Sequence, residues 1–541
     1  MRMRAIGILT LAILAGLTAT MGEVVAAGSA DPANALQPEA SAGPPFDVLE
    51  YQVMGNSVLT AVAIERAVTP FLGPGRTIKD VERAREALEK VYHDAGYLTI
   101  FVDIPEQKVD EGVVELRVTE GKVARLRVQG SRYYSLGRIK GGVPALAEGT
   151  VPYFPKVQQE LGALNRSPDR RVTPVLKPGR GPGTVDVDLK VDDSLPLHGS
   201  LELNNQQSPN TEPLRLAGAV RYDNLWQRDH SIGFNFQTSP QDTSQVRIFS
   251  GSYVLPTSHD GSVLALYAVD SKSSVGAVGG VTVLGAGRIF GAREVVPLAS
   301  SERYFQSLTL GIDYKSFDQA VTLLGADTFN TPIKYTPMLL QYSGTQIDTR
   351  GQTQFNLGLN FAMRGFAGNR DEDFANKRFL AHANYAYLRA DVQRTQVLPR
   401  GFSLNLKIEG QAAGQPLISN EQYSAGGADS VRGYLEAEQL GDNGIRGKIE
   451  LHTPSVASAR GLAGTFDEAY GLVFLEGAKL YTLEALPGQA SSALLSSAGL
   501  GMRLKARKHV SLGADVAWPF KQTQFTEARE PHVHARLIYE F

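Results

Sequence analysis

Residues 195–541 predict a membrane-spanning antiparallel β-barrel of sixteen strands, and residues 46–194 predict two small α+β units in front of it. Segments of roughly ten residues alternate apolar and polar side chains, for example Phe402–Glu409. After the amino-terminal region, no apolar run is long enough for a membrane helix. A soluble β-sandwich also alternates, but it rarely sets large apolar residues against Lys, Glu and Asn so consistently. The pattern therefore favours a barrel with a wet interior.

The alternating segments number about sixteen, and an even number lets the ends of an antiparallel barrel meet. They begin near residues 199, 213, 230, 244, 261, 283, 303, 333, 350, 377, 401, 445, 468, 493, 508 and 531. Several connections after odd-numbered segments are long, whereas several after even-numbered segments are short, which is typical of surface loops and periplasmic turns. The longest connection, 411–444, is therefore expected on the surface side.

The composition excludes several classes of protein. There is no cysteine, so neither a disulfide scaffold nor a thiolate metal site is possible. The 54 basic and 56 acidic residues nearly balance, which gives no electrostatic reason to expect nucleic acid as a partner. Glycine is abundant, at 55 residues, and suits a β-rich chain, although a soluble β-protein has a similar composition.

The amino terminus predicts export. Residues 1–27 combine a basic start at Arg2 and Arg4, a short apolar run and a cluster of small residues, as a cleaved signal peptide does. Residues 28–45 are rich in Ala, Pro, Gly and Ser and predict a flexible linker. A short helix near Asp31–Leu36 remains an alternative within that linker.

Two similar units are expected between the linker and the barrel. Residues 46–120 predict the order β-α-α-β-β, with a capping box at 77–80 and a helix that buries one apolar face. The expected face consists of Ile78, Val81, Ala84, Leu88 and Val91. Residues 121–194 predict a looser copy, with a strand at 123–129, a helix at 155–165 and a hairpin across 172–191.

The longest connection carries the most distinctive sequence of the chain. Its two motifs are Ser430, Val431, Arg432, Gly433 and Tyr434, and then Gly441, Asp442, Asn443 and Gly444. A surface loop of this length is usually polar and mobile, whereas an Arg between Val, Gly and Tyr indicates a tip that packs in one place. Gly433 permits a tight backbone turn beside that place.

These motifs resemble a known family. Val-Arg-Gly-Tyr before the twelfth strand resembles the signature of the outer-membrane assembly and secretion superfamily. The flanking Ser430 and the Gly-Asp-Asn-Gly motif resemble its two-partner secretion branch, the haemolysin and filamentous-adhesin transporters; residues 104–107 and 221–225 agree. The resemblance implies two polypeptide-transport-associated (POTRA) domains, 46–120 and 121–194, in the periplasm, before a sixteen-stranded outer-membrane barrel.

The resemblance also implies a function. The chain would recognise a large partner protein of adhesin or cytolysin type in the periplasm and secrete it unfolded through the barrel, without a cofactor. One alternative is an assembly factor for other outer-membrane proteins, which usually carries three or more periplasmic domains. Another is a passive porin, in which the periplasmic domains have no role. Outer-membrane lipids and the barrel assembly machinery are the other partners expected.

A pairing partner for Arg432 also follows from the resemblance. In the family the loop folds into the lumen, and its Arg pairs with the acid of a Phe-x-Asp-x-Gly motif on the thirteenth strand. The matching stretch here begins at Phe474 and has Glu476 in place of Asp, so Asp515 and Glu409 remain alternatives. A partly hydrated lumen is expected to screen the pair, so breaking it should cost about as much as breaking an exposed pair, ~1 kcal/mol.

Enzymatic chemistry is not expected. The sequence contains neither a Gly-x-Ser-x-Gly elbow nor a His-Glu-x-x-His zinc motif. His532 and His534 share one face of the last segment, but no third metal ligand is indicated, so no metal site is expected. Tyr539 and the terminal Phe541 share the other face and resemble the signal that outer-membrane assembly machinery reads.

Overall fold

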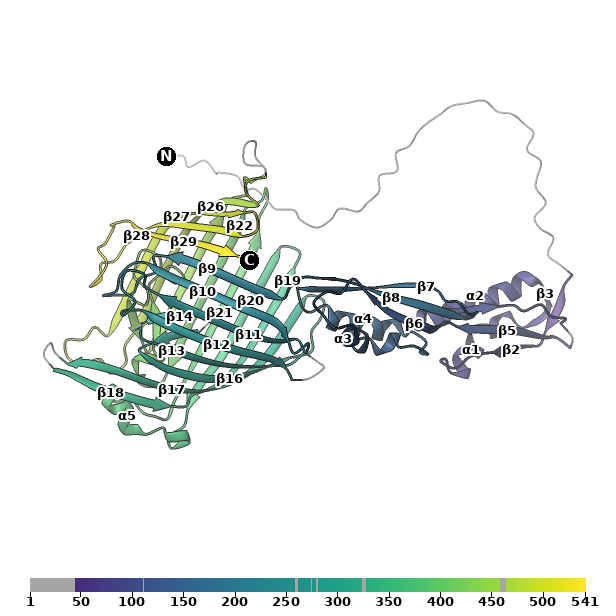
Figure 1. The fold of residues 1–541 in the computed structure, drawn as a ribbon, viewed down its shortest axis with the longest axis horizontal. Coiled ribbons are helices and arrows are strands. Elements are labelled where there is room, and N and C mark those ends of the chain that lie inside the picture. The colour runs from purple at the N-terminus through teal and green to yellow at the C-terminus, as the bar shows by residue number, and fades with distance from the viewer. Residues whose placement is uncertain are drawn as a thin grey trace, which may run out of the picture. The chain divides into compact units, whose positions relative to one another are not determined.

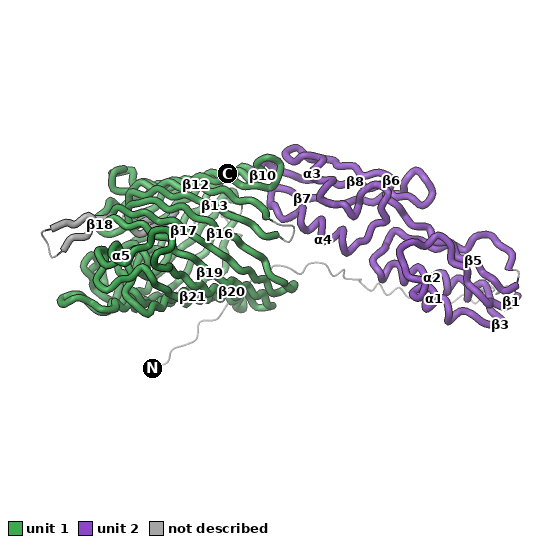
Figure 2. The backbone as a smooth tube through the Cα atoms, turned by 90° about the horizontal axis from the view of Figure 1, so that it is seen from below, with its two compact units in different colours: residues 1–16, 197–541 green, residues 17–196 purple. Residues whose placement is uncertain are grey.

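The computed structural model describes residues 44–109, 111–257, 261–273, 275–278, 281–323, 327–457 and 464–541. The expected signal peptide, residues 28–43 of the expected linker and the alternative helix at Asp31–Leu36 lie outside these residues. The described chain forms two compact units, which meet in the sequence between Pro196 and Leu197 (Figure 2).

The first unit begins with a three-stranded sheet and two helices (Figure 1). Its elements are β1 (Phe46–Val48), β2 (Glu50–Met54), α1 (Ala61–Val68), η1 (Thr69–Phe71), β3 (Gly73–Arg76), α2 (Ile78–Asp94), β4 (Ile100–Asp103) and β5 (Val113–Glu120). The sheet order is β2-β5-β4, with β2 parallel and β4 antiparallel to β5, while β1 pairs with β3. This is the expected β-α-α-β-β arrangement.

Helix α2 begins with the expected capping box, because Thr77 and Asp80 bond to each other's backbone N–H groups. Its buried face differs from the expectation in three places. Ile78 is exposed and Val91 only half-buried, whereas Tyr92 is fully buried. The later turns of the helix meet β4, where Glu89 accepts a hydrogen bond from the Val102 N–H at 3.0 Å.

A second sheet with helices follows in the same unit. Its elements are β6 (Lys122–Gln129), α3 (Leu136–Gly141), η2 (Pro144–Leu146), α4 (Phe154–Leu164), β7 (Arg170–Pro178) and β8 (Thr184–Asp193). The order is β6-β8-β7, with β6 parallel to β8, so the arrangement repeats that of the first sheet. The short helix α3 was not expected from the sequence.

The second unit is a closed antiparallel barrel (Figure 1). Its strands are β9 (Leu197–Asn204), β10 (Arg215–Leu225), β11 (His230–Thr238), β12 (Arg247–Pro256), β13 (Val263–Ser271), β16 (Gly287–Pro297), β17 (Tyr304–Leu323), β18 (Asp327–Tyr335), β19 (Met338–Asp348), β20 (Gly351–Ala362), β21 (Tyr385–Val397), β22 (Ser403–Ala413), β25 (Asn443–His452), β26 (Glu468–Tyr481), β27 (Ser492–Ala506), β28 (Val510–Pro519) and β29 (His532–Glu540). Pairing of β29 with β9 closes it.

The barrel has sixteen strands, as expected, because β18 and β19 are two parts of one strand that both pair with β17. The interruption falls at Pro337, which has no N–H to donate to a ladder. The tenth strand, β21, begins at Tyr385 rather than near residue 377, because helix α5 (Asp371–Lys377) precedes it.

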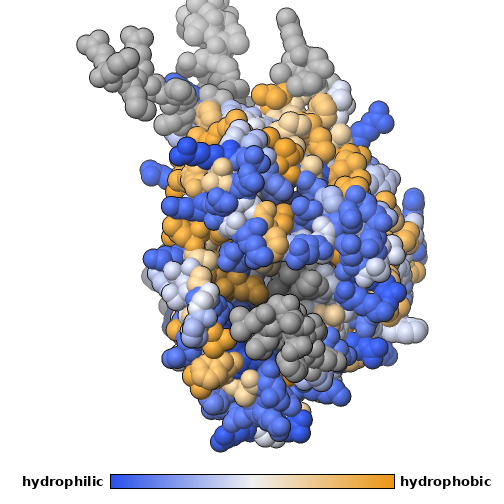
Figure 3. All heavy atoms as spheres, turned by 90° about the vertical axis from the view of Figure 1, so that its left-hand side faces the viewer, coloured by the Kyte–Doolittle hydropathy of each residue, from blue (hydrophilic) through white to orange (hydrophobic). Residues whose placement is uncertain are grey.

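The outer face of the barrel is apolar, as a membrane requires. Along β17, for example, Leu310, Ile312 and Tyr314 are exposed, while Asp313 between them is buried on the inner face. Figure 3 shows the barrel from the end that carries α5: hydrophilic residues spread across the middle of this face and hydrophobic residues gather toward its margins. No helix within the described part of the chain is long and apolar enough to cross a membrane.

The connections at one end of the barrel carry the remaining elements. With β9 counted as the first strand, they follow the odd-numbered strands and lie at the end opposite to the one where β9 begins. They contain β14 (Val275–Val278), β15 (Val281–Leu284), η3 (Phe366–Gly368), α5, η4 (Ser419–Glu421), β23 (Tyr423–Ala425) and β24 (Gln439–Gly441).

Candidate functional site

The long connection between β22 and β25 folds into the barrel. Its strands β23 and β24 pair with each other as a small hairpin. The apolar residues of the loop pack against inward side chains of β26 and β27 in one buried cluster. That cluster consists of Tyr423, Ala425, Val431, Tyr434, Ala478, Leu480 and Leu495. The loop therefore lies against one side of the lumen rather than outside the barrel.

The alternation of exposure settles which face of β26 points inward. Val473 and Leu475 are exposed on the outer face, whereas Phe474 and Glu476 are buried on the inner face. Both faces of this strand are apolar in sequence, because its inner face packs against the loop instead of facing water. The alternation of residue types therefore could not show which face points inward.

Arg432 and Glu476 lie in direct contact. The Arg432 backbone N–H donates to Glu476 Oε2 at 2.7 Å, and its guanidinium donates to Oε1 through Nε at 3.0 Å and Nη2 at 2.5 Å. The two side chains are 1% and 0% exposed. The expectation of a screened, partly hydrated pair is therefore wrong, because the loop itself excludes water from the contact.

Two further carboxylates approach the same guanidinium. Glu450 on β25 accepts a hydrogen bond from Nη2, and Asp515 on β28 lies 3.4 Å from Nη1. The ring of Phe474 completes the enclosure, with its centroid 3.5 Å from the guanidinium carbon. We call Arg432 with these three carboxylates the inner anchor. One cation thus faces acids from three strands of the wall.

The two alternative partners of Arg432 have different places. Asp515 belongs to the inner anchor, although it pairs more closely with Arg503, at 2.8 Å. Glu409 does not reach Arg432 and pairs instead with Arg446 and Lys407. Sequence reasoning missed Glu450. Its inward position in the alternation of the twelfth strand was the available signal.

The residues next to Arg432 hold the tip by other means. Gly433 has a φ of +94° and donates its N–H to Nε2 of His534 on β29 at 2.8 Å. The Tyr434 hydroxyl donates to the backbone carbonyls of Ser496 at 3.1 Å and Lys521 at 3.0 Å. The tip is therefore held by both charged and neutral bonds.

Val431 and Ser430 stabilise the tip from within the loop. Val431 is fully buried in the cluster on β26 and β27. The Ser430 hydroxyl accepts a hydrogen bond from the Gly426 N–H at 3.1 Å. Val431 therefore anchors the tip to the wall, while Ser430 shapes the turn.

The Gly-Asp-Asn-Gly motif lies at the root of the loop, where β24 passes into β25. Asp442 is 0% exposed and accepts hydrogen bonds from Arg378 and from the backbones of Leu417 and Leu483. Asn443 Oδ1 accepts the Ala413 N–H at 2.5 Å. The motif thus closes the loop at its base.

The carboxyl terminus lies at the closure of the barrel. Phe541 exchanges backbone hydrogen bonds of 3.0 Å with Gly199 on β9. A Cβ at Gly199 would lie 2.1 Å from the Phe541 ring, so only glycine leaves room for it. Tyr539 and Phe541 are exposed on the outer face, with ring centroids 6.2 Å apart.

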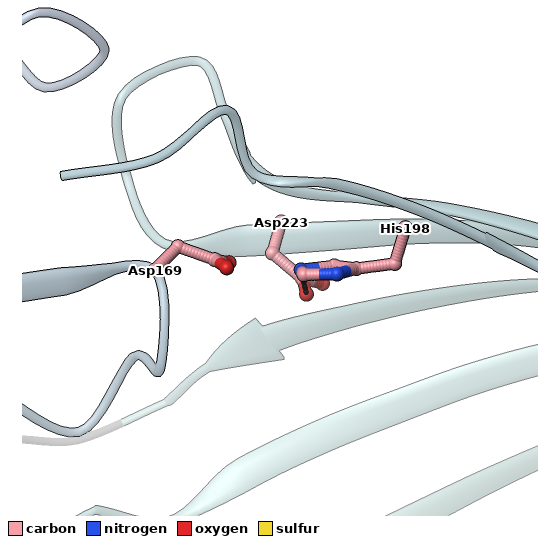
Figure 4. A group of neighbouring side chains, drawn as sticks. All are labelled: Asp169, His198 and Asp223. Atoms are coloured by element: carbon pink, nitrogen blue, oxygen red, sulfur yellow. Dashed lines mark ion pairs between the residues drawn. The ribbon is translucent and has the colours of Figure 1, made fainter. Parts of the chain in front are cut away.

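Possible metal ligands occur in both units. Figure 4 draws Asp169, which belongs to the first unit, and His198 and Asp223, which lie on neighbouring barrel strands with a His198 Nε2 to Asp223 Oδ2 distance of 3.6 Å. In the last strand, the rings of His532 and His534 are 4.8 Å apart, and His534 already accepts the Gly433 N–H.

Comparison with known proteins identifies the family. Residues 183–467 match the family of haemolysin secretion/activation proteins ShlB/FhaC/HecB, and residues 46–121 match the ShlB-type POTRA domain. The chain belongs to this family. It is a two-partner secretion transporter: its barrel lies in the outer membrane, its POTRA domains lie in the periplasm, and it secretes a large partner protein. Members of the family are transporters rather than enzymes.

Individual relatives agree with this assignment. The heme/hemopexin transporter protein HuxB of Haemophilus influenzae strain 86-028NP is 21% identical over 486 residues, covering 88% of this chain and 84% of HuxB. The outer membrane transporter CdiB of Escherichia coli O6:K15:H31 is 28% identical over 190 residues, covering 35% of this chain and 32% of CdiB.

Solved structures show the same fold. The structure of CdiB from Escherichia coli has a TM-score of 0.63 at 21% identity and covers 94% of this chain and 93% of its own. BamA from Haemophilus ducreyi, solved without POTRA domains 1–3, has a TM-score of 0.55 at 13% identity, covering 92% of this chain and 100% of its own. At these identities the likeness concerns the fold alone.

Proposed function

We propose that the long loop is the part of the transporter that must be held in the lumen for secretion to occur, and that Arg432 holds it there. The supporting observation is the inner anchor, where one buried guanidinium meets three carboxylates from β25, β26 and β28. Burying so many charges is unfavourable unless they are paired. Apolar packing alone, as in the cluster around Val431 and Tyr434, would fill the space without burying charge.

We further propose how the partner protein is handled. The POTRA domains capture its amino-terminal region by edge-strand pairing or groove binding, since strands β2, β4, β6 and β7 lie at sheet edges. The partner then crosses the barrel unfolded and without ATP, as the sequence carries no nucleotide motif. Folding outside the cell gives the direction. An adhesin or a cytolysin is the type of partner proposed.

The remaining assignments belong to the same proposal. Residues 46–120 and 121–194 act as separate domains, supported by a separate buried core in each. The exposed Tyr539 and Phe541 are read by the barrel assembly machinery, and the apolar outer face contacts outer-membrane lipids. The chain has no enzymatic activity, needs no metal or cofactor and binds no nucleic acid, in line with its motifs and balanced charge.

Deleting residues 46–120 tests the division of labour. We expect secretion of the partner to stop while the barrel still inserts, because residues 197–541 form a closed barrel with its own terminal strand. The measurements are partner protein in the medium and heat-dependent gel mobility of the barrel in outer-membrane fractions. Loss of the barrel from the membrane would contradict independent domains, and undiminished secretion would contradict capture by the first domain.

A further inference from the structure

The root of the long loop joins three surface connections through one carboxylate. Asp442 accepts hydrogen bonds from Arg378 Nη2 at 2.7 Å and also from Arg378 Nη1, in the β20–β21 connection. It accepts the backbone N–H of Leu417, in the long loop, at 2.8 Å and that of Leu483, in the β26–β27 connection, at 2.7 Å. Arg378 in turn donates to the Leu417 and Leu483 carbonyls, so the junction is closed from both sides.

The β20–β21 connection, residues 363–384, packs into the mouth of the barrel. Phe374 of α5 is 1% exposed and lies between Tyr335 and Tyr385, with ring centroids 5.4 and 5.8 Å away. It belongs to a buried apolar cluster inside the surface end of the barrel. Members of that cluster are Ile248, Val269, Ile289, Phe317, Ile333, Tyr335, Ala362, Phe374, Ala381, Ala383, Tyr385, Tyr387, Leu417 and Ile418. The wall residues of this cluster come from strands between β12 and β21, so the connection covers this side of the lumen at the surface end.

The first part of the long loop shares this packing. Leu417 and Ile418 lie in the same apolar cluster. Next to them Glu421, 2% exposed, accepts hydrogen bonds from Lys315 at 2.7 Å, Tyr335 at 2.6 Å and Tyr387 at 2.7 Å. The long loop and the β20–β21 connection are therefore fixed to the same part of the wall.

We propose that residues 363–384 form a lid that closes the surface end of the barrel, and that the buried Arg378–Asp442 pair fastens this lid to the root of the long loop. A partner protein that crosses the barrel has to displace the lid. The lid's role in transport rests on the proposed function, whereas closure of the pore by the lid does not.

Removing Arg378 tests closure. In Arg378→Ala, Asp442 loses the only charged partner among the contacts described above and keeps only its neutral hydrogen-bond donors. A buried carboxylate without a cation is unfavourable. We expect the lid to loosen and the mean conductance of the purified protein in planar bilayers to rise severalfold. Arg364→Ala is the matched control, because Arg364 lies in the same connection but forms an exposed pair with Asp371. Conductance of Arg378→Ala equal to that of wild type would overturn closure.

A cross-link tests whether the lid must move. Asn369 in the lid is 1% exposed and accepts the Thr336 N–H at 2.8 Å, and the chain contains no cysteine of its own. We expect Thr336→Cys with Asn369→Cys, bridged by oxidation or by a short bis-thiol reagent, to block secretion, and reduction or each single cysteine to permit it. Bridging is scored by peptide mass before each assay.

The two experiments separate the possible failures. Normal secretion by a fully bridged protein would overturn the lid as a moving part, whatever the conductance of Arg378→Ala. Absence of secretion by the wild-type chain with its partner would contradict the proposed function, while the conductance comparison would still decide closure. If Arg378→Ala does not assemble, Arg378→Gln, which keeps a neutral donor, takes its place in the conductance measurement.

Discussion

The two ends of the long loop are held by opposite arrangements of charge. At the tip, one cation, Arg432, is surrounded by three carboxylates of the barrel wall. At the root, one carboxylate, Asp442, is surrounded by Arg378 and by backbone N–H groups of two connections. Both charged side chains are buried.

This difference determines what each end tolerates. Removal of the cation at the tip leaves Glu476 buried without its cation and beside the carboxylate of Glu450, and the two like charges repel each other. Removal of the cation at the root leaves a single negative charge that still accepts two backbone hydrogen bonds. The tip should therefore be the more sensitive end. The tip is also the part of the loop that is bound to β25, β26 and β28, along which a substrate would pass.

The largest effect is expected from Arg432→Ala. Breaking a buried ion pair by removing one partner destabilises a folded structure by roughly 3–5 kcal/mol. Here the loss should destabilise the anchored position of the loop, because the pairing of the strands still holds the barrel together. We expect the loop to leave the wall and secretion to fall sharply, more than in Arg378→Ala. Thiol labelling of Ala425→Cys, a site 0% exposed in the anchored loop, reports release. Labelling that is equally fast with and without the Arg432→Ala change would contradict the comparison.

Removal of single carboxylates should give a graded series. Glu476→Gln is expected to weaken secretion most, because Glu476 accepts three hydrogen bonds from Arg432. Glu450→Gln should follow, and Asp515→Asn should act least through Arg432, since Asp515 pairs mainly with Arg503. Secretion yield normalised to inserted barrel measures the order. A reversed order would show that Glu476 is not the principal partner.

A smaller effect is expected from Tyr434→Phe. The change removes hydroxyl bonds to the backbones of Ser496 and Lys521 but keeps the ring in its apolar cluster. A neutral hydrogen bond contributes about 1 kcal/mol, so the loop should remain on the wall with only slightly faster labelling of Ala425→Cys. Labelling as fast as in Arg432→Ala would mean that charge is not what distinguishes the tip.

The smallest effect concerns Asp80, a half-buried carboxylate that, like Asp442, accepts a hydrogen bond from a backbone N–H group. The Thr77 backbone N–H, and then its hydroxyl, lower the pKa of Asp80 at the start of α2. A lowered pKa stabilises the folded state above the unfolded pKa and loses this effect as the pH falls through the folded pKa. Asp80→Asn should therefore speed amide hydrogen exchange in the first turn of α2 at neutral pH and match wild type in acid.

A helix-end control accompanies this measurement. Asp94→Asn removes an exposed pair with Lys90 at the other end of α2 and should leave exchange in the first turn unchanged. If Asp80→Asn slows exchange, or differs from wild type equally at every pH, the carboxylate is not the cap that the structure shows.

The sequence was informative wherever a pattern is local. Strand alternation has a period of two residues, so it gave the number of strands and the outer face of most of them, though not the orientation of β26. The capping box at Thr77 and Asp80 is equally local. The start of β21 was placed too early because residues 378–384 also contain apolar side chains, of which Ala381 and Ala383 pack in the cluster inside the barrel rather than in a strand.

Contacts across the lumen could not be read from local patterns, which show that a side chain such as Glu450 points inward but not which residue it meets. Glu450 meets Arg432, and Arg378 meets Asp442, only because the loop folds back into a closed barrel. Glu476 was found through a resemblance, since β26 is apolar on both faces. The burial of the inner anchor was also missed. Water was expected around this pair in the lumen, but the loop itself displaces that water.

The central claim is that Arg432 acts through Glu476, and a double-mutant cycle tests it most directly. Secretion yield per inserted barrel is compared for wild type, Arg432→Ala, Glu476→Ala and the double variant. If the pair holds the loop, the double variant should secrete no less than Arg432→Ala alone, because the contact is already lost. Losses that multiply in the double variant would show that the two residues act separately.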